Sequence, residues 1–200
     1  VNPLSANDFE LNHDGGQAKV IVVEDSQLIT GKIFSDVPEK DGKVIVDIEK
    51  DILKIAILNR YLPDVKPSVA LVKNFGLKNG AIASSVAHDS HNIIVVGTSD
   101  VLMAEATNLI IQEKGGLSAV GPTGNKVLNL PVAGLMSNSD GFLVASSYIE
   151  VDKKAKELGS GLQSPFMTLS FMGLLVIPHL KLSDKGLFDS DLFKFEKVFG

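Results

Sequence analysis

The sequence has 200 residues, of which 44% are hydrophobic and 22% are charged, and its formal net charge is -5. These values exclude a disordered or collagen-like chain and indicate one globular domain of ordinary size, or at most two small ones. Arg60 is the only arginine. Because clustered arginines are the usual ligands of nucleic-acid phosphates, no nucleic-acid partner is expected.

The chain contains no cysteine. This excludes disulfide frameworks, thiolate zinc sites, iron–sulfur clusters and the zinc deaminases that bind their metal through a Cys-x-x-Cys pair. The same absence suits a cytoplasmic protein. The longest apolar run, near Phe171 to Ile177, is far shorter than the ~20 residues that span a bilayer, so no membrane partner is expected.

The first 17 residues are polar and rich in turn-forming residues, which is typical of a linker or a loosely docked arm. The chain begins at Val1 and shows no signal-peptide pattern. We therefore interpret residues 1–17 as a linker or arm and residues 18–200 as one domain. No internal repeat or break in composition indicates a second domain.

Runs of β-branched residues predict strands in the first half of the domain. The expected strands cover residues 18–24, 28–35, 43–48, 53–59, 69–75, 81–87 and 92–98. The first two are expected to form a hairpin. The Asn79-Gly80 pair predicts a second hairpin between the strands over 69–75 and 81–87, because Asn-Gly favours tight turns between antiparallel strands.

Helical signals dominate the second half. The expected helices cover residues 101–114, 141–158 and 165–174, and two short strands over 117–120 and 126–130 separate the first two helices. Asp100 is the expected cap of the first helix, and the apolar positions of the second include Phe142, Ala145, Ile149 and Ala155. The sum predicts an α+β fold with a mixed, largely antiparallel sheet flanked by two to three helices.

The densest polar cluster lies between two apolar strands. Its members are Ser84, Ser85, His88, Asp89, Ser90, His91 and Asn92. A hydrolytic site needs a base with a pKa near 7, a carboxylate that orients it and donors that bind a polar substrate, and this cluster contains all three. The alternative is a tight turn in which Asp89, Ser90 and Asn92 bond to the backbone, while the histidines pack against other residues or face solvent.

A metal site made by this chain alone is not expected. His88 and His91 are three residues apart, and on a strand this spacing would direct their rings to opposite faces. His13 and His179 are the only other histidines. The sequence also lacks the glycine-rich patterns that bind nucleotide phosphates after a strand.

Five stretches carry a resemblance to a known family. They are FGLKNGAIAS (75–84), VAHDSHN (86–92), LPVAGLMS (130–137), SPFMTLSF (164–171) and LKLSDKGL (180–187). In this order they resemble the C-terminal domain of bacterial and archaeal adenine deaminases, over nearly the whole chain from Ala18. Gly173 and Leu175 depart from the Ala and Pro of that family, which bears on the course of the last helix.

The resemblance implies a metal-dependent hydrolase of the amidohydrolase type, which converts adenine and water to hypoxanthine and ammonia in purine salvage. It implies a missing N-terminal (β/α)8 barrel that holds iron or manganese, and residues 1–17 would be the linker from this barrel. Adenine would be the substrate of the full-length enzyme, and the barrel would be the partner of this domain. The His-x-His motif of such barrels is absent from this sequence. The chain alone is therefore expected to be inactive and to hold no metal, and a homo-oligomer is left open.

The polar tip, defined here as His88, Asp89, Ser90, His91 and Asn92, is the expected pocket-closing element of such an enzyme, with Ser84 and Ser85 as candidate substrate-binding residues. The domain would otherwise only stiffen the barrel or form subunit contacts through residues 166–171. A reading of another class also remains: a free-standing, non-catalytic binding or interaction module.

Overall fold

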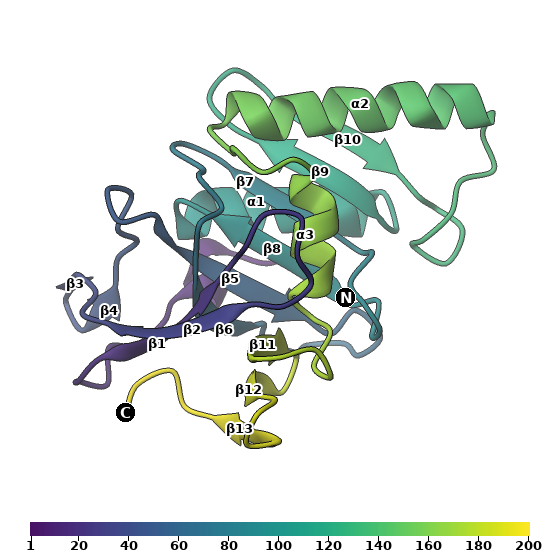
Figure 1. The fold of residues 1–200 in the computed structure, drawn as a ribbon. Coiled ribbons are helices and arrows are strands. Elements are labelled where there is room, and N and C mark those ends of the chain that lie inside the picture. Colours follow the sequence, from purple (N-terminus) through teal and green to yellow (C-terminus); the bar gives the residue numbers. More distant parts are fainter.

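A computed structural model describes residues 1–200 and shows helices on both faces of one large sheet (Figure 1). The strands of this sheet are β1 (Ala18–Val22), β2 (Gly31–Ser35), β5 (Ile52–Leu58), β6 (Ser68–Lys73), β7 (Ala81–Ser84), β8 (Ile93–Gly97), β9 (Gly116–Val120) and β10 (Lys126–Asn129). Their order is β10-β9-β7-β8-β5-β6-β1-β2. Only β1 and β6 are parallel neighbours, so the sheet is mixed and largely antiparallel, and the expected α+β class is confirmed.

The remaining elements are small sheets and helices. The small strands are β3 (Glu39–Lys40), β4 (Lys43–Val44), β11 (Leu180–Ser183), β12 (Gly186–Asp189) and β13 (Lys194–Glu196). The helices are α1 (Asp100–Gln112), α2 (Gly141–Glu157), α3 (Pro165–Phe171) and the 3-10 helix η1 (Ala6–Phe9). None of them is both long and apolar enough to cross a membrane.

The large sheet separates two hydrophobic cores. Helix α1 packs with η1 on one face, over β7, β8 and β9, while α2 and α3 cover the other face (Figure 1). The central strand β5 serves both cores: Ile55 and Ile57 belong to the α3 side, and Ala56 and Leu58 to the α1 side. A strand that is covered on both faces needs apolar residues at successive positions, which explains the sequence ILKIAIL.

Lys54 is the one charged residue in β5, and it is paired. Its Nζ lies 2.7 Å from the Asp100 carboxylate at the first position of α1. The cap of this helix is Ser99, whose hydroxyl accepts a hydrogen bond from the Leu102 amide, so the expected capping role of Asp100 is wrong. The reason is that the Ser99 backbone is extended whereas Asp100 is already helical.

Helix α2 begins and ends close to the expected residues, but its core face agrees with the prediction only in part. Ala155 is buried as expected and Val151 is buried beside it, whereas Phe142 and Ile149 are 88% and 66% exposed. The helix covers only the β9–β10 edge of the sheet, so a narrow stripe suffices to bury it. Helix α3 ends at Phe171, three residues before the expected end.

The expected hairpin around Asn79-Gly80 is wrong, because β8 and β5 lie between β7 and β6 in the sheet. Long-range contacts decide the course of this connection. Both carboxylate oxygens of Asp51 accept the Gly76 amide, at 3.0 and 2.9 Å, while Phe75 and Leu77 are fully buried. The chain therefore crosses to another part of the sheet before β7 begins.

The strand expected over residues 43–48 is also mostly wrong. Only Lys43 and Val44 pair in a ladder, with β3. The chain then turns, and the Asp47 carboxylate accepts the Lys50 amide at 2.9 Å. This side-chain bond stabilises a turn that the alternation of apolar residues did not reveal.

The opening segment is packed more firmly than a loosely docked arm. Phe9 is fully buried in the α1-side core. The Leu4 amide donates to Asn108 Oδ1, and Asn108 Nδ2 donates to the Leu4 carbonyl, both at 2.8 Å. The turn-rich composition therefore did not reveal that Phe9 and Leu4 attach this segment to the domain. The linker role of residues 1–17 stays a prediction.

Candidate functional site

The polar tip lies in the loop between β7 and β8, and the structure brings all its predicted residues together there. They differ in exposure: Asp89 and Ser90 are exposed, His88 and His91 are half-buried, and Asn92 is buried. The turn interpretation accounts for part of the cluster, since the Asn92 amide donates to Ser90 Oγ at 3.4 Å. It also accounts for the His88 ring, which packs against Phe171, but not for His91 Nδ1, which is buried without a partner.

Ser84 and Ser85 are both buried at the end of β7, but their hydroxyls are used differently. Ser85 Oγ donates to the Gly134 carbonyl at 2.5 Å and accepts the Gly116 amide at 2.8 Å. It therefore joins β9 to the loop after β10, which argues against the predicted contact with substrate. Ser84 Oγ accepts the Val86 amide at 2.9 Å, so its own proton stays available.

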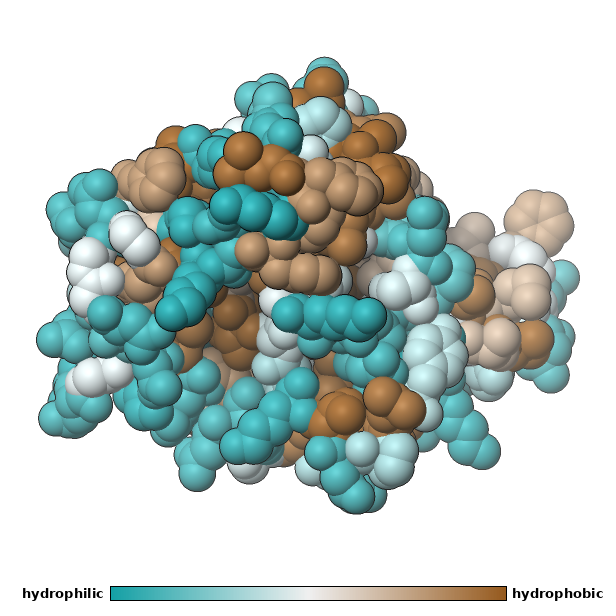
Figure 2. Space-filling view, turned by 90° about the horizontal axis from the view of Figure 1, so that it is seen from below, coloured by the Kyte–Doolittle hydropathy of each residue, from teal (hydrophilic) through white to brown (hydrophobic).

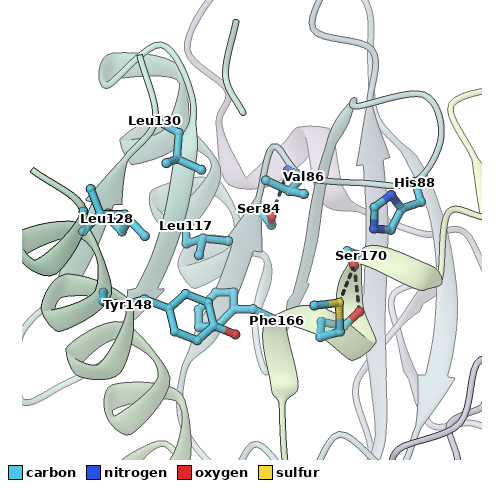
Figure 3. A pocket seen from close by; sticks show the side chains of 13 residues that line it. Ser84, Val86, His88, Leu117, Leu128, Leu130, Tyr148, Phe166 and Ser170 are labelled. Carbon is cyan, nitrogen blue, oxygen red and sulfur yellow. Dashed lines mark hydrogen bonds between the residues drawn. The ribbon is translucent and has the colours of Figure 1, made fainter. Parts of the chain in front are cut away.

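His88 lines a cavity of about 510 Å³ between the sheet and the helices α2 and α3. Its ring packs against Phe171, with 4.6 Å between the ring centroids. Figure 3 shows the Ser84 and His88 side chains together with Tyr148 of α2 and Phe166 of α3 around this cavity. The composition of the tip predicted the polar residues of this cavity. It did not predict the cavity walls formed by α2 and α3, whose residues lie about 50 or more positions later in the sequence.

Arg60 fixes the tip, and sequence reasoning missed this role. Its Nε donates to the His91 carbonyl at 2.5 Å and its Nη2 donates to the Ala133 carbonyl at 2.6 Å. His91 and Ala133 both have left-handed backbones, with φ of 52° and 57°, a conformation that is costly for residues other than glycine. Gly134 has a φ of 72°, and a Cβ there would lie 2.5 Å from Arg60 Nη1, so any other residue would be strained and would displace the guanidinium.

Two buried polar atoms of the tip have no hydrogen-bond partner within the chain. They are His91 Nδ1 and Asn92 Oδ1. Buried polar atoms nearly always have a hydrogen-bond partner, so two such atoms without one in neighbouring residues need an explanation. Neither atom is accessible at the surface of these 200 residues, so the loop would have to rearrange before a group from outside could bond to it.

The residues of the tip do not form a metal site by themselves. The His88 and His91 rings lie 6.3 Å apart, and no three His, Asp or Glu side chains of the chain converge on one point. The expectation that the rings diverge is wrong, because residues 88–91 form a turn rather than a strand. Two histidines alone fall short of the three protein ligands typical of a hydrolytic metal centre.

The chain enters the domain beside the tip. Val1 lines a second, smaller cavity of about 250 Å³ together with Arg60, Ile93 and Lys114. In Figure 1 the N-terminus accordingly lies close to the loop that leads into β8. Any polypeptide that preceded Val1 would therefore begin next to the residues that hold the tip.

Comparisons with known proteins identify the family. The sequence pattern of the family described as adenine deaminase C-terminal domain matches residues 27–194. An adenine deaminase of Salinibacter ruber is 47% identical over 98% of the chain, and one of Sulfurovum sp. is 56% identical over 88%. A third, from Methanosarcina acetivorans, is 51% identical over 90%.

The matched regions cover 36%, 32% and 32% of these three relatives, so the chain spans about a third of their length. The family match covers most of the large sheet and all three α-helices, including the tip and the cavity walls. The chain therefore belongs to the adenine deaminase C-terminal domain family.

Proposed function

We propose that this chain is the C-terminal domain of an adenine deaminase, a hydrolase that converts adenine and water to hypoxanthine and ammonia in purine salvage. The support is the name shared by relatives that are 46–56% identical to the chain. The absence of cysteine suits a cytoplasmic location for this enzyme.

The chemistry of the reaction is assigned to polypeptide that lies outside these 200 residues. A preceding (β/α)8 barrel would hold iron or manganese and the catalytic residues, and such barrels carry their active sites on the face formed by the loops after the strands. The present chain offers no set of three metal ligands. Its role is therefore to dock on the barrel and shape the pocket.

The polar tip is the part of the domain that we assign to the barrel's pocket. The observation that carries this assignment is the position of the tip: Asp89 and Ser90 are exposed, and Arg60, which binds the His91 carbonyl, lines a cavity together with Val1. A docked barrel would cover these exposed side chains, and the tip would exclude water from the closed site.

Substitutions in the full-length enzyme test this role. His88→Ala, Asp89→Ala and His91→Ala each remove one polar side chain of the tip, and Asp36→Ala removes an exposed carboxylate on the distant β2–β3 connection as a matched control. We expect kcat/KM for adenine to fall about 10- to 100-fold in the histidine variants, because small misplacements in a closed site have effects of that size. The control should retain full activity.

Metal content and thermal stability separate the alternatives. Loss of turnover with unchanged metal content and melting temperature supports pocket closure. Unchanged adenine turnover in all three variants would reduce the tip to a turn. A protein whose gene encodes no barrel before Val1 would instead be a free-standing, non-catalytic module.

A further inference from the structure

The cavity beneath α2 has the lining of a small-molecule site. Its volume of about 510 Å³ lies within the usual range for ligand pockets. Leu117 and Leu128 of the sheet, Val144 of α2 and Phe166 of α3 form apolar walls, and no Asp, Glu, Lys or Arg lines it. A charged ligand would lose its hydration there without gaining an opposite charge, so an uncharged ligand is favoured.

Polar groups with unused hydrogen-bonding capacity stand at the edges of this apolar space. Ser84 Oγ accepts the Val86 amide and keeps its proton for another acceptor. In Figure 3 no hydrogen bond joins the Tyr148 hydroxyl or the His88 ring to the other lining residues. Burial raises the pKa of Tyr148, so this hydroxyl is a neutral donor at physiological pH.

Three rings are also available for stacking. Tyr148, Phe166 and His88 line the cavity, and Phe171 holds the His88 ring from behind at a centroid distance of 4.6 Å. Aromatic and apolar surfaces bind the faces of planar bases, while hydrogen bonds at the rim select their edges. A flat ring system with acceptor and donor nitrogens matches both features.

We propose that the cavity between α2, α3 and the sheet binds an uncharged planar heteroaromatic molecule of the size of a free purine base. Ser84 and Tyr148 would bond to the edge of the ring system, and Phe166 with the apolar walls would contact its faces. This site lies within the present chain. It does not depend on whether the tip closes the pocket of a preceding barrel.

Binding to the 200-residue chain can be measured directly by calorimetry and by amide chemical shifts. The probes are adenine and hypoxanthine, with indole as a planar ring that lacks an acceptor nitrogen and AMP as a charged analogue. Because a purine base has few atoms, we expect a Kd of roughly 0.1 to 1 mM. Indole and AMP should bind at least ten-fold more weakly than the purine bases.

Two variants and one control locate the site. Ala145→Trp places a large side chain at the mouth of the cavity and should weaken purine binding at least ten-fold, whereas Ser146→Trp on the exposed side of the same helix should not. Tyr148→Phe removes one hydroxyl and should weaken binding about three- to ten-fold. Dispersed amide spectra confirm that each variant is folded.

Four results would overturn the proposal. Two concern affinity for other ligands: equal affinity for AMP, and equal affinity for indole, which would refute recognition of ring nitrogens. The other two are the absence of binding by both purine bases, and binding that Ala145→Trp and Ser146→Trp weaken to the same extent. An empty cavity in all titrations would point instead to a hydrophobic side chain of a neighbouring domain as its occupant.

Discussion

Lys181 of β11 is fully buried, and its ammonium donates to the Leu28 carbonyl at 2.7 Å. Burial lowers the pKa of this side chain from its usual 10.5 to about 8. This pKa difference means that the charged form of Lys181 lowers the free energy of unfolding by about 3 kcal/mol. Lys181→Met fills similar space without charge and loses one hydrogen bond of about 1 kcal/mol.

We therefore expect Lys181→Met to be about 2 kcal/mol more stable than the wild type at pH 7. The unfolded wild type binds more protons than the folded one between pH 8 and pH 10.5. The stability of the wild type consequently rises with pH in this window, and the advantage of the variant disappears or reverses near its upper end.

Urea unfolding followed by circular dichroism at pH 6.5, 8, 9 and 10 measures this difference. Lys185→Met in the adjacent β11–β12 turn is the matched control, because Lys185 is exposed and its substitution should change stability by no more than about 0.5 kcal/mol at any pH. A stability difference between Lys181→Met and the wild type that does not vary with pH would refute the reasoning.

Two further predictions concern the opening segment and the tip. Phe9→Ala should lower the free energy of unfolding by about 3 to 5 kcal/mol, because Phe9 is a core residue. Urea unfolding checks this, and a loss below about 0.5 kcal/mol would show that Phe9 does not anchor the opening segment. Arg60→Lys should destabilise the chain by about 1 to 3 kcal/mol and speed amide exchange at Asn92, since one ammonium cannot hold the His91 and Ala133 carbonyls in the geometry of a guanidinium fork. Unchanged exchange at Asn92 would show that Arg60 does not hold the tip.

Elements with local signals were predictable from the sequence. Asp140, whose side chain accepts the Phe142 and Leu143 amides, and Gly159, with φ of 114°, mark the two ends of α2. Both signals act within a few residues. Strand pairing depends on distant residues, and the Asn79-Gly80 signal was overridden by the Asp51–Gly76 contact across 25 positions.

The candidate site was predictable only in its composition. The polar tip stood out because seven of its residues and neighbours are polar or titratable between two apolar strands. The cavity beside the tip and the hydrogen bond that holds the tip were not predictable. Arg60 lies 31 residues before His91 in the sequence, and the cavity walls come from α2 and α3. The position of a lone arginine in the sequence carries no indication of the carbonyls that it will bind.

The parallel pairing of β1 with β6 has a consequence for the order of folding. Val20 pairs with Leu71, whereas β1 and β2 or β7 and β8 meet through short connections. Contacts between residues so far apart in the chain form late, because the loop between them must first lose its conformational freedom. We expect the β1–β2 hairpin to join a nucleus already built from β5, β6 and β8, so that the chain's first strand is among the last to reach its native register.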